Sequence, residues 1–362
     1  MMTETRFGKA AMAFAAAALI AGPVLAQSTT AIQGFPIKMG TSGGSVSDSS
    51  RLYCCGGTLG ALVNYGGQIH ILSNNHVVAR SGSAASGEDI IQPALIDVGC
   101  STTRSSVVAD FIGDVVPLGS GNVDAALARP RAGAVDLTGA QLNIGIPCAG
   151  IQTATAGLPV AKSGRTTGYT TGTVQATNVS VNVQYQKGCN SGKKFTVPFT
   201  NQISITPGTF SAGGDSGSLI VSNDGTPNPV GLLFAGSSAV TIANPAQTVA
   251  NAFGNGFSFV GQSCGGAAVE AAVVGLDEYS FANAKSIKER AEAQLFERPD
   301  VVGVGVGRAS DNKDSLDANE PAIIVYVETA KGKLPKGLPR QIDGVKVRVI
   351  ATDPIVSRAG CN

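Results

Sequence analysis

The sequence is poor in several residue types, and each shortage argues against a class of function. It contains no tryptophan and only two histidines, and no two cysteines have the CxxC spacing of a zinc site. Charged residues make up 14% of the chain and the formal net charge is +1, so no basic surface for nucleic acid is indicated. We therefore expect no metal, no cofactor and no nucleic-acid partner.

Long apolar runs are also missing. The one prominent run, Ala10 to Ala21, follows a basic start with Arg6 and Lys9 and is too short to span a bilayer. Small residues ending at Ala26 complete the pattern of a secretory signal peptide over residues 1–26. We expect an exported protein, periplasmic or secreted, with no membrane association after signal removal.

Seven cysteines suit an exported chain, because disulfides persist in oxidising compartments. The odd count leaves at least one cysteine without a partner in the chain. Cys100 lies in the same half as the adjacent Cys54 and Cys55, so we expect it to bond one of these two. The other pairings and the oligomeric state stay open.

Glycine and proline are abundant, at 47 and 17 residues, and long helical patterns are scarce over most of the chain. Short apolar segments separated by turn residues predict a mainly β fold with antiparallel barrels. A Ser/Gly/Thr-rich lead-in over residues 27–52 precedes them. The expected strands are 58–63, 68–72, 106–112 and 123–127, then 160–162, 172–185, 195–197, 202–205, 218–221 and 230–234.

The composition changes near the end of the sequence. Residues 281–362 hold 24 of the 51 charged residues and read as a helix over 281–297 followed by strands at 301–308, 322–328 and 345–350. Valine and glycine alternate from Val302 to Gly307, which favours a strand whose glycines let the helix approach closely; a nucleotide loop would need GxGxxG. We expect a small α+β domain here.

Residues 210–221 read Phe-Ser-Ala-Gly-Gly-Asp-Ser-Gly-Ser-Leu-Ile-Val. Ser216 stands among glycines, which permit a tight loop with inward-turned backbone N–H groups, and an apolar strand follows. A serine becomes a nucleophile only with a base to take its proton and donors to stabilise the oxyanion. By itself the run fits an ordinary surface turn equally well.

Two further residues make a catalytic interpretation of residues 210–221 more specific. His76 follows a strand-like segment, and Asp124 enters an apolar one, 48 residues after His76 and 92 residues before Ser216. The His-Asp-Ser order with gaps of about 45 and about 90 is that of the chymotrypsin triad. His70 lies inside a strand, and Asp110 and Asp114 have the positions of solvated carboxylates, so we prefer His76 and Asp124 over these alternatives.

The local motifs around the three residues are SNNHV, VDAA and GGDSGSLI. With them, roughly residues 55–262 resemble the trypsin/chymotrypsin-like serine peptidases, and the pattern is similar to a bacterial trypsin-like group and to the plant Narrow-leaf peptidases. The resemblance implies a double antiparallel β-barrel over residues 53–265 with the site in the cleft between the barrels. The small α+β domain, residues 281–362, would follow.

The resemblance also implies a role for each residue. Ser216 would attack a peptide carbonyl, His76 would take and return the proton, and Asp124 would orient the imidazole. The N–H groups of Gly214 and Ser216 would form the oxyanion hole. The substrate would contact Phe210, Phe234, Ala235 and Gly236. Because Phe210 carries no charge, we expect small or apolar side chains before the cleaved bond.

Some positions depart from the family pattern. Ser218 stands where a glycine is usual, and Phe234 replaces a serine that contacts the aspartate, so Asp124 would need another donor. Two alternatives to an exported serine endopeptidase acting on proteins or peptides are kept. One is a non-catalytic binding protein of the same fold. The other is an esterase, which ranks lower because this sequence lacks the Gly-x-Ser-x-Gly elbow of esterases. Residues 281–362 are expected to modulate the site, for example by covering the cleft, and to supply no catalytic group.

Overall fold

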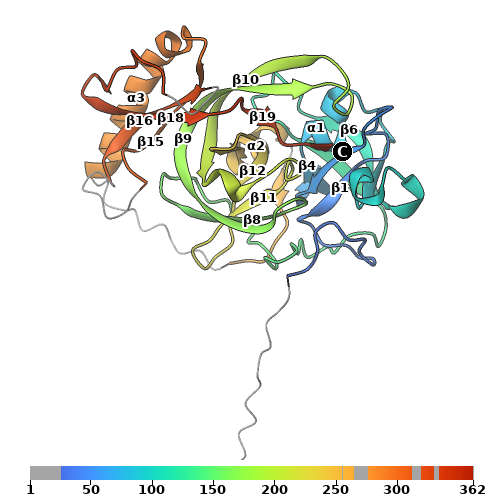
Figure 1. The fold of residues 1–362 in the computed structure, drawn as a ribbon. Helices are drawn as coiled ribbons and strands as arrows, with labels where there is room; N and C mark the ends of the chain where they lie inside the picture. Colours follow the sequence, from blue (N-terminus) through green and yellow to red (C-terminus); the bar gives the residue numbers. More distant parts are fainter. Residues whose placement is uncertain (1–25, 255, 265–275, 312–318, 330–333, 362) are drawn as a thin grey trace, which may run out of the picture.

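The protein is described by a computed structural model covering residues 26–254, 256–264, 276–311, 319–329 and 334–361. Almost all of the expected signal peptide lies outside these residues. Strands dominate, in two sheets that lie side by side, and a helix with further strands extends one of them (Figure 1). The expected mainly β fold with a small C-terminal α+β part is confirmed.

The first sheet is built largely from the N-terminal half of the chain. Its order is β14-β3-β4-β7-β6-β5-β1-β2-β20 within the described residues. Its strands are β1 (Thr41–Ser45), β2 (Cys55–Leu59), β3 (Ala61–Tyr65), β4 (Gln68–Ser73), β5 (Asp89–Gln92), β6 (Ser106–Val115), β7 (Ala126–Pro130), β14 (Ser258–Phe259) and β20 (Gly360–Cys361). All neighbours are antiparallel, and the inner faces enclose a cluster of buried aliphatic residues.

The second sheet closes on itself. Its strands are β8 (Pro159–Gly164), β9 (Gly168–Gln186), β10 (Lys194–Thr206), β11 (Leu219–Ser222), β12 (Pro229–Gly236) and β13 (Thr241–Pro245). They pair in the order β10-β13-β12-β11-β8-β9, and the long β9 also pairs with β10, which completes a barrel. The barrel wall positions the loop before β11, which carries Ser216.

Later strands continue this second sheet beyond β9. They are β15 (Val301–Arg308), β16 (Pro321–Glu328), β17 (Gln341–Ile342) and β18 (Val345–Thr352), while β19 (Val356–Ser357) pairs with β12 and β9 of the barrel. β15 pairs antiparallel with β9. Helix α3 (Leu276–Phe296) packs through Ala284 and Ile287 on the face of these later strands that is opposite the barrel core. The proposed domain boundary at residue 281 stays a prediction.

The glycines of β15 have a different use from the expected one. A Cβ on Gly307 would lie 2.3 Å from the carbonyl oxygen of Gln175, and one on Gly305 would lie 2.8 Å from Val179, both on β9. Their absence of a side chain therefore lets β15 lie against β9. The helix instead packs on the valines of β15.

The remaining helices are short: α1 (Asn75–Val78), α2 (Ala246–Phe253) and the 3₁₀ turns Arg80–Gly82, Leu95–Val98, Thr102–Arg104 and Gly208–Phe210. The single strand expected at 58–63 is divided at Gly60 into β2 and β3. At this glycine the chain lies so near the backbone of Gly217 that a Cβ would be 1.9 Å from the Gly217 oxygen. No helix among the described ranges has the length and apolar character needed to cross a membrane.

Candidate active site

His76 lies in α1, directly after β4, and its imidazole faces Asp124. Nδ1 of His76 is 2.5 Å from Oδ2 of Asp124, and the backbone N–H of His76 donates to Oδ1 at 3.2 Å. Asp124 precedes β7 rather than lying within a strand, so its carboxylate is free to turn toward α1. Both residues are buried, and the pair has the geometry of a carboxylate that orients an imidazole.

Asp124 has a second side-chain donor that the sequence did not reveal. The hydroxyl of Tyr185, near the end of β9, donates to Oδ2 of Asp124 at 2.8 Å. Burial, and then the nearby Asp124 carboxylate, raise the pKa of Tyr185 well above its usual value, so the phenol keeps its proton and stays a donor. Tyr185 supplies the donor that Asp124 needs because Phe234 stands in place of a serine. It lies 61 residues from Asp124, and no local motif marks it.

The Ser216 loop is shaped by two glycines. Gly214 and Gly217 have φ values of 101° and 95°, in the region that disfavours residues with a side chain. The carbonyl of Ser216 accepts from Thr58 on β2 at 2.7 Å, which ties the loop to the first sheet. The Ser216 hydroxyl donates to the Phe234 carbonyl at 3.2 Å, while His76 Nε2 has no hydrogen-bond partner among the described residues.

Beneath this loop lies a buried ion pair. Lys162 Nζ is 3.7 Å from Asp215, and both side chains are inaccessible to solvent. Asp215 also accepts from the backbone N–H groups of Thr166 and Ala212, at 2.9 Å each. Burial lowers the pKa of Lys162 to about 8, while the Asp215 carboxylate favours its charged form. The pair holds the loop to β8, a role the sequence analysis missed.

The two N–H groups of the predicted oxyanion hole converge on one oxygen. Gly214 N donates to the carbonyl of Arg358 at 2.5 Å, and Ser216 N approaches the same oxygen at 3.4 Å. Arg358 belongs to residues 353–361, which we call the cleft segment. In Figure 1 this segment runs past the label β19 to the end of the chain beside the first sheet.

A cavity of about 340 Å³ opens beside His76. Its walls include Asp48, Tyr185 and Cys55, together with Ser357 and Ala359 of the cleft segment. Burial raises the pKa of Asp48 to about 6, against the opposing influence of Arg80 and His76. The cavity is therefore lined by both polar and apolar groups, and the ionisable carboxyl of Asp48 and the imidazole of His76 both line it.

The predicted substrate contacts have different surroundings. Phe234, Ala235 and Gly236 lie on β12, where Phe234 O accepts from Arg358 N at 3.0 Å and Ala235 is paired with Ser357. Phe210 is almost fully buried in the barrel core. The part played by Phe210 in substrate selection stays a prediction.

The residues set aside in the sequence lie elsewhere. His70 is on β4, with Nδ1 3.1 Å from the Gln68 carbonyl oxygen and its ring against Tyr65, and burial lowers its pKa. Asp110, on β6, accepts from Arg131 at the surface, at 2.7 Å, and Asp114 is partly exposed on the same strand. Neither carboxylate has the contact with His76 that Asp124 makes.

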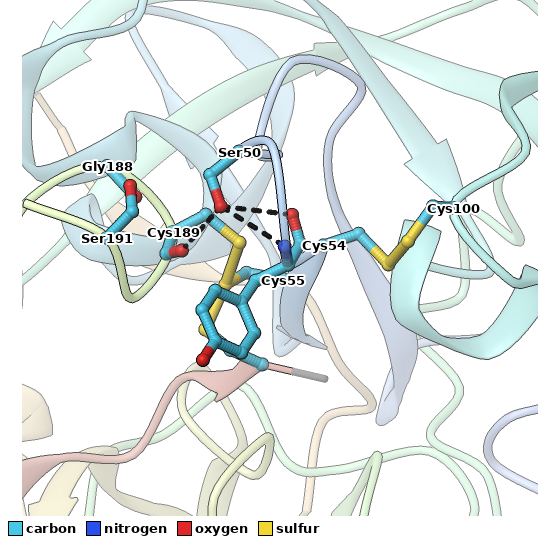
Figure 2. The surroundings of a disulfide bond; sticks show 9 residues. Ser50, Cys54, Cys55, Cys100, Gly188, Cys189 and Ser191 are labelled. Carbon is cyan, nitrogen blue, oxygen red and sulfur yellow. Dashed lines mark hydrogen bonds between the residues drawn. A yellow bond between two sulfur atoms is a disulfide. The ribbon is translucent and has the colours of Figure 1, made fainter.

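The cysteines lie in two separate pairs and one group of three. Cys100 is bonded to Cys54, one of the two partners expected for Cys100, and Cys148 is bonded to Cys264. The sulfurs of Cys55, Cys189 and Cys361 all lie within 4.8 Å of one another. Figure 2 shows Cys55 beside Cys189 of the loop between β9 and β10, with the Cys54–Cys100 bond pointing the other way.

No protein-family model matches the chain, and no characterised protein matches it in sequence. Solved structures are similar in outline. A glutamic acid-specific serine protease, described with a histidine triad in substrate binding, is 23% identical with a TM-score of 0.40, covering 62% of this chain and 100% of its own. Protease A of Thermobifida fusca is 21% identical with a TM-score of 0.39, covering 57% and 92%. An alpha-lytic protease homologue, N4, is 20% identical with a TM-score of 0.41, covering 62% and 98%. At these TM-scores the likeness carries no argument about activity.

Proposed function

We propose that the protein is an exported serine endopeptidase that hydrolyses peptide bonds through an acyl-enzyme. The observation that carries the proposal is the convergence of Gly214 N and Ser216 N on a backbone carbonyl oxygen beside the Ser216 side chain. Donors in this arrangement stabilise the negative oxygen that forms when a carbonyl is attacked. The His76–Asp124 contact supplies an oriented base.

In the proposed reaction, Ser216 Oγ attacks the carbonyl carbon while His76 Nε2 takes its proton. His76 then gives this proton to the leaving amine, and water repeats the sequence to release the acyl group. Asp124 holds Nδ1 of His76 and stabilises the imidazolium, helped by the Tyr185 hydroxyl. The Ser216 side chain must first rotate away from the Phe234 carbonyl to meet His76.

A non-catalytic binding protein is the second candidate. The observation that favours it is the hydrogen bond from Ser216 to the Phe234 carbonyl, which leaves His76 Nε2 without a partner. Labelling with a fluorophosphonate probe separates the two, because the probe reacts only with an activated serine. An esterase would share the chemistry and differ only in substrate.

The test compares wild type with Ser216→Ala and with Ser222→Ala, a buried serine at the far end of β11 whose hydroxyl donates to Thr226. We expect labelling of wild type and Ser222→Ala and none of Ser216→Ala. Labelling of all three would reject Ser216 as the nucleophile. Absence of labelling in all folded proteins, including the cleft-segment variants described below, would favour the binding protein.

Export is part of the proposal. The Cys54–Cys100 and Cys148–Cys264 bonds support it, since disulfides persist in oxidising compartments. Mass spectrometry of protein recovered from the periplasm or medium should find Gln27 as the first residue.

A further inference from the structure

The cleft segment lies across the candidate active site as an added strand. Ser357 and Val356 pair antiparallel with Ala235 and Gly236 of β12. On its other side, Val356 is in register with Gln184 of β9, whose N–H donates to Ile355 O at 2.9 Å. Addition of a strand to a sheet edge is a common way to hold an extended peptide.

The register places one peptide bond at the reacting position. Phe234 O accepts from Arg358 N at 3.0 Å, and the carbonyl oxygen of Arg358 lies between the N–H groups of Gly214 and Ser216. The bond presented to the Ser216 side chain is therefore Arg358–Ala359.

The Arg358 side chain also has a defined place. Its Nη2 donates to the carbonyl of Ser237, and a Cβ on Gly236 would lie 2.8 Å from its Nε. The site therefore admits a long basic side chain here, although the uncharged Phe210 favoured small or apolar ones. The groups that contact the Arg358 side chain here are the Ser237 carbonyl and the backbone at Gly236.

Beyond the presented bond, the segment joins the first sheet. Gly360 and Cys361 pair with Gly56 and Cys55 of β2. A Cβ on Gly360 would lie 3.0 Å from Cα of Gly214, so the close approach depends on this glycine. The segment thus spans both sheets, and its far end lies within disulfide distance of Cys55.

We propose that the cleft segment is a tethered, substrate-like inhibitor of the proposed peptidase, held closed by a Cys55–Cys361 disulfide and released by exchange with Cys189. The proposal rests on the proposed function, and it names the regulation of the same site. It explains why backbone donors expected for a substrate are already used within the chain.

The geometry also explains how the segment resists cleavage. While the Ser216 hydroxyl donates to Phe234 O, its proton is not offered to His76. If the Arg358–Ala359 bond were attacked, the amine of Ala359 would stay in place through the Cys361 tether. A leaving group held at high effective concentration returns readily to the acyl group.

Release follows from ordinary thiol–disulfide exchange. The Cys189 thiol loses its proton to water, and the thiolate attacks Cys55 Sγ. The Cys55–Cys361 bond breaks as the Cys55–Cys189 bond forms, and Cys361 leaves as a thiolate that takes a proton from water. No net oxidation occurs, and the three sulfurs already lie within 4.8 Å of one another.

The experiment measures the rate of fluorophosphonate labelling of full-length wild type, Cys361→Ser and Arg358→Ala. Cys264→Ser is the matched control, because it also removes a disulfide partner but outside the cleft. If the Cys55–Cys361 disulfide raises the local concentration of the segment at the cleft to about 1 mM, an occupant with a free-peptide Kd of about 0.1 mM would slow labelling about tenfold. We expect Cys361→Ser and Arg358→Ala to label about tenfold faster than wild type and Cys264→Ser to label at the wild-type rate.

A second measurement does not depend on catalysis. A fluorescent peptide with the sequence Ile-Val-Ser-Arg-Ala-Gly should bind Cys361→Ser but not wild type, measured by anisotropy. Non-reducing peptide mapping should find Cys55 bonded to Cys361 in the slow-labelling form and to Cys189 after brief thiol treatment.

The outcomes separate the two proposals. Equal labelling of wild type, Cys361→Ser and Arg358→Ala, all above Ser216→Ala, would overturn the inhibitor and leave the peptidase standing. Faster labelling of Arg358→Ala alone would overturn the disulfide latch. Peptide binding without labelling in any folded protein would support an occluded cleft and overturn the peptidase, and absence of peptide binding to Cys361→Ser would overturn the inhibitor.

Discussion

Replacing Tyr185 by phenylalanine removes one hydroxyl and keeps the ring that packs on Phe195 and Phe199. The lost contact is the 2.8 Å hydrogen bond to Oδ2 of Asp124, buried from solvent. A hydrogen bond to a charged group contributes about 1.5–3 kcal/mol. If this contact holds the carboxylate in its catalytic position, labelling of Ser216 should slow roughly 10- to 150-fold.

The assay is the second-order rate of fluorophosphonate labelling in the Cys361→Ser background. Tyr326→Phe is the matched control, because its buried hydroxyl donates to Ser204 at 2.7 Å, away from the triad. Both variants should lose stability, and only Tyr185→Phe should lose rate. Since the pKa of Tyr185 is raised well above its usual value, the rate ratio should not change from about pH 6 to about pH 9. Equal rate losses in the two variants would refute a positioning role for Tyr185.

Two further predictions concern the charges around the site. Asp124→Asn should lower the labelling rate by about 10⁴-fold, because the amide favours the wrong tautomer of His76. The control Asp110→Asn should label at the wild-type rate, and similar losses of rate in both variants would contradict the choice of Asp124. Burial lowers the pKa of Lys162 from 10.5 to about 8, so between these values the unfolded chain binds a proton that the folded chain lacks, and the free energy of unfolding should rise with pH across this window. In urea titrations Lys162→Met should lose this rise. Because the variant leaves Asp215 as an unpaired buried carboxylate, its free energy of unfolding at neutral pH should be lower by about 3–5 kcal/mol. If the difference in free energy of unfolding between wild type and variant is constant from pH 8 to above pH 10, the lowered pKa of Lys162 is rejected.

Local patterns in the sequence were enough to predict the mainly β fold and the identities of the three candidate triad residues. Apolar segments between turn residues indicate strands wherever one face is buried. The Ser216 loop can be recognised in the sequence because glycines and an apolar strand flank it. The His76–Asp124 contact was likewise anticipated from order and spacing. The contact between the His76 imidazole and the Asp124 carboxylate in the structure agrees with the anticipated pairing, while its catalytic role stays a proposal.

Only the tertiary structure decided which distant groups support these residues. Tyr185 and Lys162 reach Asp124 and Asp215 from strands far along the chain, and a tyrosine or lysine inside a strand has no local feature that distinguishes a buried donor from a surface residue. The same holds for the position of the Arg358 carbonyl between the N–H groups of Gly214 and Ser216. Strand pairing across the two sheets, rather than any nearby residue, places it there, because contacts of long sequence separation depend on the whole fold.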